Sequence, residues 1–350
     1  MIVAFIALGF LLVLAGIAIF ITNRIIRSNF KRAPYPPYAV ADYFYDHYRE
    51  QYPRKSISFR SGKNRLQGYV YGEKNDMGLI VFAHGLGSGH EYYMQEILSF
   101  VDRGWRVLAY DATGSGESEG KGTVGLVQSA RDLHAALTYV ESETAFTGLP
   151  ICLVGHSWGG YAVTAGLFFE HRVTASVSLA PYCDPTDMML HFASKNMGKW
   201  AKRLRIPVKI NMLLTFGKHY NLTAIDGINK SCVPVLLIHG TQDEMIPIEE
   251  VSVMAQIHKI TNPKVVYRVY DRNGQTGHNS IFYNASSVPY IQEVIASFKA
   301  LEQKYSGKIP NEERSRFFDS VDRDIINKPN DELLDEIHEF LTQSISHTNQ

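Results

Sequence analysis

The pattern that most constrains this chain is Gly-His-Ser-Trp-Gly at residues 155–159. It follows an apolar run at residues 151–154 and precedes a helix-like stretch at residues 160–169. In a strand, Gly-x-Ser-x-Gly, helix unit, the serine occupies a sharp turn and its hydroxyl projects above a sheet. Glycines are needed there because backbone segments pass close together on both sides of the turn. The pentapeptide arises by chance in roughly one chain in ten of this length, so its surroundings must decide.

Those surroundings alternate between strand-like and helix-like segments. Residues 56–71 read as a hairpin, and amphipathic stretches at helical spacing separate the later apolar runs. Strand-like runs occur at residues 79–83, 105–110, 151–154, 175–179, 235–238 and 265–269. Continuous apolar strands that alternate with amphipathic helices are typical of a mostly parallel sheet with helices on both faces. We therefore predict an α/β fold with such a doubly covered sheet.

Two further side chains occur where a reactive serine needs them. Serine is a poor nucleophile at neutral pH and requires an adjacent imidazole, which a carboxylate orients. Asp243 follows the predicted strand at residues 235–238, and His278 follows the strand at residues 265–269 through a glycine-rich loop. The chain order is then Ser157, Asp243, His278, as this arrangement requires. All three lie beyond the carboxyl ends of parallel strands, where open sheets place their sites.

Other residues compete for these roles. Asp271 lies seven residues before His278 and stays an alternative acid, and Asp111 also ends a predicted strand. His84 and His156 flank the site, and for both we favour structural hydrogen bonds over proton transfer.

Four motifs carry a resemblance to a known family. They are His-Gly-Leu-Gly at residues 84–87, Asp-Ala-Thr-Gly-Ser-Gly-Glu-Ser-Glu-Gly at residues 111–120, the pentapeptide, and the loops of Asp243 and His278. Over residues 55–303 the chain resembles the α/β hydrolases, and within them the monoacylglycerol lipase and serine aminopeptidase group. The resemblance implies that the backbone amides of Leu86 and Trp158 form the oxyanion hole. It implies no cofactor and no metal.

Residues 184–230 interrupt the alternation of strands and helices. The segment is too long for a plain connection, so we predict an inserted helical cap. No acidic residue lies between Asp187 and Asp226, whereas seven cations and several methionines and aromatic residues do. We expect Met197, Trp200, Ala201 and Leu204 to share one helix face. That helix either packs on the domain with a solvated basic face or rests on anionic lipid.

The two ends of the chain differ from this core. Residues 1–22 carry no charge, and as a helix they would measure about 33 Å, enough to cross a membrane. Arg24, Arg27, Lys31 and Arg32 follow, which predicts a retained anchor with the domain in the cytosol; a cleaved signal is the alternative. The predicted divisions are an anchor at 1–23, a stalk with Pro34, Pro36 and Pro37 and a first helix at 24–54, core halves at 55–183 and 231–303, the cap at 184–230, and an acidic segment with a terminal helix at 304–350.

Composition limits the choice of function. The formal charge is zero, so no basic field suggests nucleic acid, and the three cysteines show no metal-ligand spacing. We predict a membrane-anchored serine hydrolase that cleaves carboxylic esters of lipids or other apolar acyl groups. An aminopeptidase or amidase, an acyltransferase, and a non-catalytic binder built on the same fold stay open as alternatives.

Overall fold

The computed structural model describes residues 2–32, 40–272 and 274–348, except for some side chains in the first helix and the last two of the final helix. The prolines of the predicted stalk, Pro34, Pro36 and Pro37, lie outside these residues.

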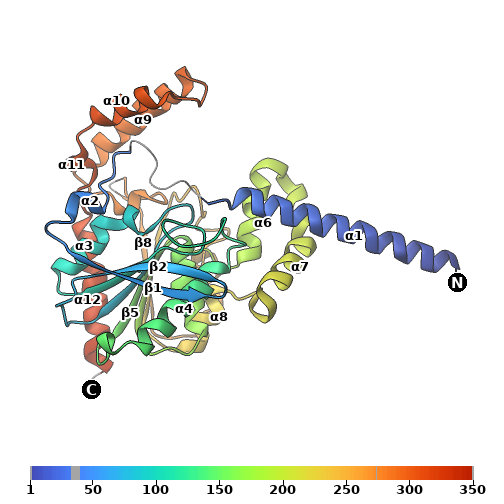
Figure 1. The fold of residues 1–350 in the computed structure, drawn as a ribbon, viewed down its shortest axis with the longest axis horizontal. Helices are drawn as coiled ribbons and strands as arrows, with labels where there is room; N and C mark the ends of the chain where they lie inside the picture. Colours follow the sequence, from blue (N-terminus) through green and yellow to red (C-terminus); the bar gives the residue numbers. More distant parts are fainter. Residues whose placement is uncertain (1, 33–39, 273, 349–350) are drawn as a thin grey trace.

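Eight strands form a single sheet in the order β1-β2-β4-β3-β5-β6-β7-β8 (Figure 1). β1 pairs with β2, and β2 with β4, in antiparallel fashion, whereas every later pair is parallel. The strands are β1 (Arg54–Ser61), β2 (Asn64–Tyr71), β3 (Leu79–Ala83), β4 (Arg106–Tyr110), β5 (Ile151–His156), β6 (Val173–Leu179), β7 (Val235–Gly240) and β8 (Val265–Tyr270). The predicted mostly parallel sheet is therefore confirmed.

The central strands are apolar throughout because both of their faces are covered. In β3 all five side chains are buried. Leu79, Val81 and Ala83 pack with α4 (Gln128–Ser142), α5 (Trp158–Ala165) and α8 (Ala224–Ser231), while Ile80 and Phe82 pack with the opposite layer. Alternate residues of a strand point to opposite faces, so one apolar run supplies two cores.

The opposite layer combines helices from distant parts of the sequence. α3 (Met94–Asp102) lies beside the last helix, α12 (Asp331–Thr348). α12 buries four apolar side chains against this face of the sheet: Leu333, Leu334, Ile337 and Leu341. Asn330 precedes α12, and its side chain donates a hydrogen bond to the Ile281 carbonyl at 2.7 Å. The end of the chain is thus part of the core.

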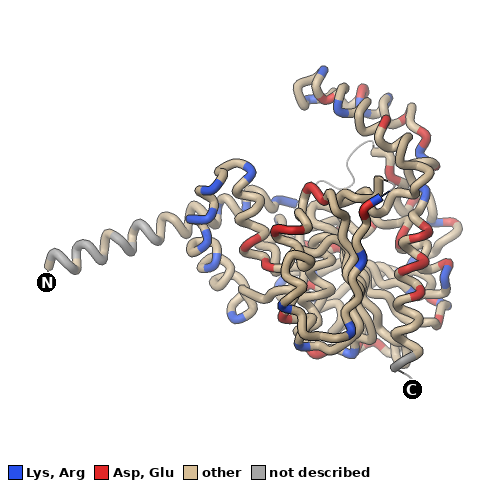
Figure 2. Tube along the Cα trace, turned by 180° about the vertical axis from the view of Figure 1, so that it is seen from behind, with Lys and Arg blue, Asp and Glu red and all other residues tan. Residues whose placement is uncertain are grey.

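The insertion after β6 forms a cap at one side of the body (Figure 1). It contains α6 (Pro185–Met197), η4 (Gly198–Leu204), α7 (Arg205–Phe216) and η5 (Gly217–His219), followed by α8. Its Lys and Arg residues gather beside the first helix, as Figure 2 shows. These basic residues are Lys195, Lys199, Lys202, Arg203, Arg205, Lys209 and Lys218.

The expected common face of Met197, Trp200, Ala201 and Leu204 is wrong. The α-helix ends at Met197, and η4 continues as a 3₁₀ helix with three residues per turn. Positions 200 and 203 then align, and Arg203 stacks on the Trp200 ring at 3.9 Å. Trp200 is 55% exposed, whereas Ala201 is 1% exposed.

The first helix, α1 (Ile2–Asn29), projects from the body beside the cap (Figure 1). Its end is held by protein: the Asn211 amide of α7 donates to the Ile19 carbonyl at 3.1 Å, and Ile26 is buried. Arg32 then donates to the carbonyls of Ser118 and Gly120. The predicted membrane span is not supported, because among the described residues we find no helix with both the length and the apolar character that crossing a membrane requires.

The remaining helices are short or peripheral. α9 (Val288–Lys304) and α10 (Asn311–Asp319) project together from the body (Figure 1) and contact each other through Phe298, Phe317 and Phe318. The others are α2 (Tyr45–Tyr48), α11 (Arg323–Ile326), η1 (His90–Tyr93), η2 (Thr144–Phe146), η3 (Gly166–Phe168), η6 (Met254–Lys259) and η7 (Ser280–Phe282).

Candidate active site

Ser157 occupies a strained turn between β5 and α5. Its φ is 57° and its ψ is −112°, a conformation that a non-glycine residue rarely adopts. Such a residue costs on the order of 1–3 kcal/mol and persists because its surroundings fix it. The two glycines of the motif do so sterically. A Cβ at Gly155 would lie 2.4 Å from the Gly159 oxygen, and a Cβ at Gly159 would lie 1.9 Å from the Ala83 oxygen.

The structure brings Asp243 and His278 into contact. Asp243 lies in the loop after β7, and its Oδ2 is 2.8 Å from His278 Nδ1. The amides of Met245 and Ile246 donate to the other oxygen at 2.9 and 2.7 Å. Burial acts to raise the pKa of Asp243, but hydrogen bonds from His239, His278 and the Ile246 amide outweigh it and hold the pKa below its usual value. Asp243 is therefore a carboxylate at neutral pH.

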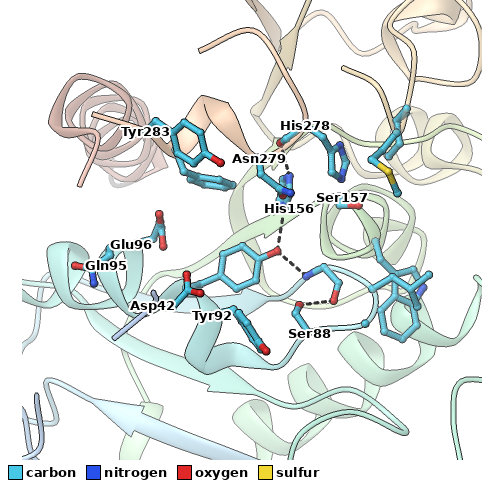
Figure 3. A pocket seen from close by; sticks show the side chains of 18 of the residues that line it. Asp42, Ser88, Tyr92, Gln95, Glu96, His156, Ser157, His278, Asn279 and Tyr283 are labelled. Atoms are coloured by element: carbon cyan, nitrogen blue, oxygen red, sulfur yellow. Dashed lines mark hydrogen bonds between the residues drawn. The ribbon is translucent and has the colours of Figure 1, made fainter. Parts of the chain in front are cut away.

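This contact fixes the orientation of the His278 ring. With Nδ1 donating to Asp243, Nε2 is the ring nitrogen that stays available as a proton acceptor. Ser157 and His278 line the same cavity, and Figure 3 labels both side chains there. Asp271 is not near this contact: its side chain is 69% exposed and lies against Arg272. Asp111 is buried and pairs with His90 at 2.9 Å.

The two amides that the resemblance implied for an oxyanion hole also border the cavity. Leu86 follows β3 and Trp158 is the first residue of α5. The first amides of a helix have no partner within it, and they favour negative charge nearby. Nothing in the described part of the chain accepts a hydrogen bond from either amide. Both are therefore free to donate to a substrate oxygen.

A buried hydrogen-bond chain that sequence reasoning missed braces these loops. The Gly85 amide donates to Tyr93 Oη at 3.0 Å, and Tyr93 Oη lies 2.8 Å from His156 Nδ1. His156 Nε2 lies 3.0 Å from the His278 carbonyl. Because burial holds the pKa of His156 well below its usual value, the ring is neutral. The tyrosine then donates to Nδ1, and Nε2–H donates to the carbonyl. His156 thus makes the structural hydrogen bonds that we favoured.

The cavity has a volume of about 580 Å³ and two chemically different parts, a size typical of small-molecule sites. One part, toward the cap, is apolar and lined by Leu126, Met188, Phe192, Met245 and Ile246. The other part contains Asp42, Tyr92, Gln95, Glu96 and Tyr283, which Figure 3 labels. We call this second part the acidic arm. Sequence reasoning missed its residues, because no local pattern marks them.

The sheet order, the turn at Ser157 and the loops after β7 and β8 define an α/β-hydrolase fold. Residues 74–224 match the family model described as serine aminopeptidase, S33. The chain therefore has the α/β-hydrolase fold, and the family model matches less than half of its length. An esterase of Pyrococcus furiosus has the same fold, with a TM-score of 0.53 and 22% identity over 77% of this chain and 97% of that one.

The alignments with curated relatives cover only part of this chain and part of each relative. A polyketide transferase of a Penicillium species is 26% identical over 138 residues, which are 38% of this chain and 47% of the relative. A Bacillus subtilis protein named YqkD, described as uncharacterized, is 26% identical over 213 residues, 58% of this chain and 66% of its own. The chain thus spans about half to two thirds of these relatives.

Proposed function

We propose that this α/β hydrolase is a serine hydrolase that cleaves carboxylic esters through an acyl-enzyme. The observation that carries the proposal is the 2.8 Å contact between His278 Nδ1 and Asp243 Oδ2, at the cavity that Ser157 also lines. A carboxylate that holds the imidazole in this orientation is what a serine needs to become nucleophilic.

The reaction follows from these positions. Ser157 Oγ attacks the carbonyl carbon as its proton passes to His278 Nε2, and Asp243 stabilises the imidazolium that forms. The amides of Leu86 and Trp158 donate to the developing oxyanion, a contribution of about 3–4 kcal/mol for one such donor. His278 returns the proton to the leaving alcohol, and the ester bond breaks. Water then attacks the acyl-enzyme by the same route and releases the acid.

Labelling with a fluorophosphonate probe tests the nucleophile. The probe should label the wild-type protein and spare Ser157→Ala. Ser142→Ala is the matched control, because Ser142 lies on the surface of α4 and its hydroxyl donates to the Tyr139 carbonyl at 2.8 Å. Equal labelling of wild type and Ser157→Ala would remove the mechanism.

The apolar part of the cavity supports an apolar acyl group. Five apolar side chains line it, so longer acyl chains bury more surface there, at about 0.8 kcal/mol per methylene. For p-nitrophenyl esters, kcat/KM should rise from acetyl to octanoyl. A flat or falling series would contradict the preference for apolar acyl groups while leaving the nucleophile intact.

Acyl transfer is a second candidate, because one relative is named a polyketide transferase. Both reactions share the acyl-enzyme and differ in what attacks it. Adding increasing concentrations of a primary alcohol to a turnover assay separates them. An acyltransferase would form the new ester in preference to the free acid, and a hydrolase would form mainly the acid.

The location of the protein stays a prediction from the sequence. The uncharged segment at residues 1–22, followed by four cations, is the ground for placing the domain at the cytosolic side of a membrane. Carbonate extraction of a membrane fraction tests attachment, and protease protection tests the side. Release of the full-length chain by carbonate would contradict an anchor.

A further inference from the structure

The acidic arm holds two carboxylates that lack partners. Glu96 is 8% exposed and lines the cavity, and among the described residues it accepts a hydrogen bond only from its own amide. Asp42 is half-buried and lines the same cavity, and among the described residues its carboxylate also accepts a hydrogen bond only from its own amide. Within the residues that the structure describes, neither forms an ion pair. Buried carboxylates are usually paired or bound to a cation, so this arm is built for a ligand that the protein itself does not supply.

The two carboxylates act on the same space. Burial first, and then the charge of Asp42, raise the pKa of Glu96 to about 7. Burial, and then the charge of Asp42, raise the pKa of Tyr92 to about 12. The same two causes raise the pKa of Tyr283. Figure 3 shows these side chains around one part of the cavity. A group that enters the arm meets both acids and the tyrosine rings.

The two nearby cations, Arg323 and Lys328, do not form ion pairs with Asp42 or Glu96. Arg323 lowers the pKa of Asp42, but its guanidinium donates to the main-chain carbonyls of Ala41 and Asp42 and stacks on Tyr43. Lys328 is exposed at the border of the cavity, and its Nζ donates to Ser286 Oγ at 3.1 Å. A third acid, Glu244, also lines the cavity. Its Oε2 accepts the His278 amide at 3.1 Å.

We infer that the acidic arm binds an ammonium group carried by the substrate, with Asp42 and Glu96 as its counter-ions and Tyr92 and Tyr283 around it. Two carboxylates stabilise such a cation, and aromatic faces add to its binding. An anionic group is repelled there, and an apolar group leaves both acids without partners. This inference rests on the proposed function, since the bond that breaks is the ester at Ser157. It makes the protein selective for cationic esters.

A pair of isosteric thioesters tests the selectivity. Butyrylthiocholine carries a quaternary ammonium group, and 3,3-dimethylbutyl thiobutyrate replaces that nitrogen by carbon. The ratio of their kcat/KM values should exceed about tenfold in the wild type, which corresponds to about 1.4 kcal/mol. It should fall toward one in Glu96→Gln and in Asp42→Asn. Glu293→Gln is the matched control, because Glu293 is exposed on α9 and makes no contact with the arm.

A binding experiment separates this inference from the proposed function. Titration calorimetry of Ser157→Ala with tetramethylammonium and with methylammonium should give heat of binding that Ser157→Ala/Glu96→Gln lacks, with sodium chloride as the ionic-strength control. The tighter ion tells whether the group is quaternary or primary. Binding without any ester turnover by the wild type would end the proposed function and keep the arm. Turnover with a thioester ratio near one, and no binding, would overturn the arm alone.

Discussion

Beside one end of the cavity the Asp243 carboxylate accepts hydrogen bonds from His278, His239 and two backbone amides, whereas at the other end Asp42 and Glu96 accept none from another described residue. The consequence is visible in their pKa values, which are lowered at Asp243 and raised at Glu96. A fully paired acid orients its neighbour and stays charged. An unpaired acid can bind a ligand, but it destabilises the fold as long as no ligand is bound.

The largest effect should come from the paired end. Asp243→Asn keeps the size of the side chain but removes the charge and favours the wrong His278 tautomer. We expect kcat to fall about 10⁴-fold with little change in KM. Steady-state kinetics on an octanoyl ester measure the loss, and circular dichroism checks the fold. A loss of less than tenfold would show that another residue orients His278.

Glu96→Gln should make the folded protein more stable at neutral and alkaline pH. The folded-state pKa of about 7 lies above the usual 4.5, so the folded state favours the protonated form. The negative charge of Glu96 therefore does not destabilise the fold below pH 4.5. Its destabilising effect grows between pH 4.5 and 7 and is constant above pH 7. The variant should therefore raise the free energy of unfolding by up to about 3 kcal/mol at pH 8 and by almost nothing at pH 4.5.

Urea unfolding at the two pH values, with Glu293→Gln beside it, measures this difference. The control should change little at either pH, because Glu293 is exposed. A Glu96→Gln protein less stable than wild type at pH 8 would mean that the carboxylate has a partner after all.

Tyr93→Phe tests the hydrogen-bond chain that joins Gly85, Tyr93 and His156 near the active site. The change removes the hydroxyl between the Gly85 amide and His156 and leaves two buried groups without a partner. Unfolding free energy should drop by about 1–3 kcal/mol. Because the brace holds the loops that carry Leu86 and His278, kcat should also fall, by a smaller factor than in Asp243→Asn. An unchanged kcat would separate the brace from the active site.

The smallest effect is expected at Asp42. Its pKa is raised by burial, but Arg323 acts in the opposite direction and offsets part of the effect. Asp42→Asn should therefore stabilise the protein at pH 8 in the same direction as Glu96→Gln but by less. The double variant tests coupling: since the two charges repel, the second change should add less than it does alone. Strict additivity would place the two acids too far apart to share a ligand.

Sequence and structure agree where the determining pattern is local. Residues 151–159 predicted a strand, a turn and a helix, and the loops of Asp243 and His278 could be found because each follows an apolar run. The sheet with one hairpin and parallel central strands is predictable for the same reason. The structure places Asp243 and His278 in contact, while their catalytic roles stay a prediction.

The missed features depend on long-range contacts or on a small change in helix geometry. Glu96 reads as an ordinary polar residue of a helix, and only the packed structure shows that it is buried. Asp42 comes near it because Arg323 and Asn327 hold the carbonyls of Ala41 and Asp42, from 281 to 286 residues away. The cap pattern failed because three and 3.6 residues per turn place Trp200 on different sides. The residue spacing of an α-helix cannot show that a segment folds as a 3₁₀ helix.

The attachment of Ala41 and Asp42 to α11 sets an order of assembly. During synthesis, residues 41 and 42 leave the ribosome long before Arg323 and Asn327 exist to hold them. Until then the wall of the cavity that carries Asp42 lacks the contacts that hold it in place. The wall that carries Asp42 is therefore completed only after most of the chain has been made.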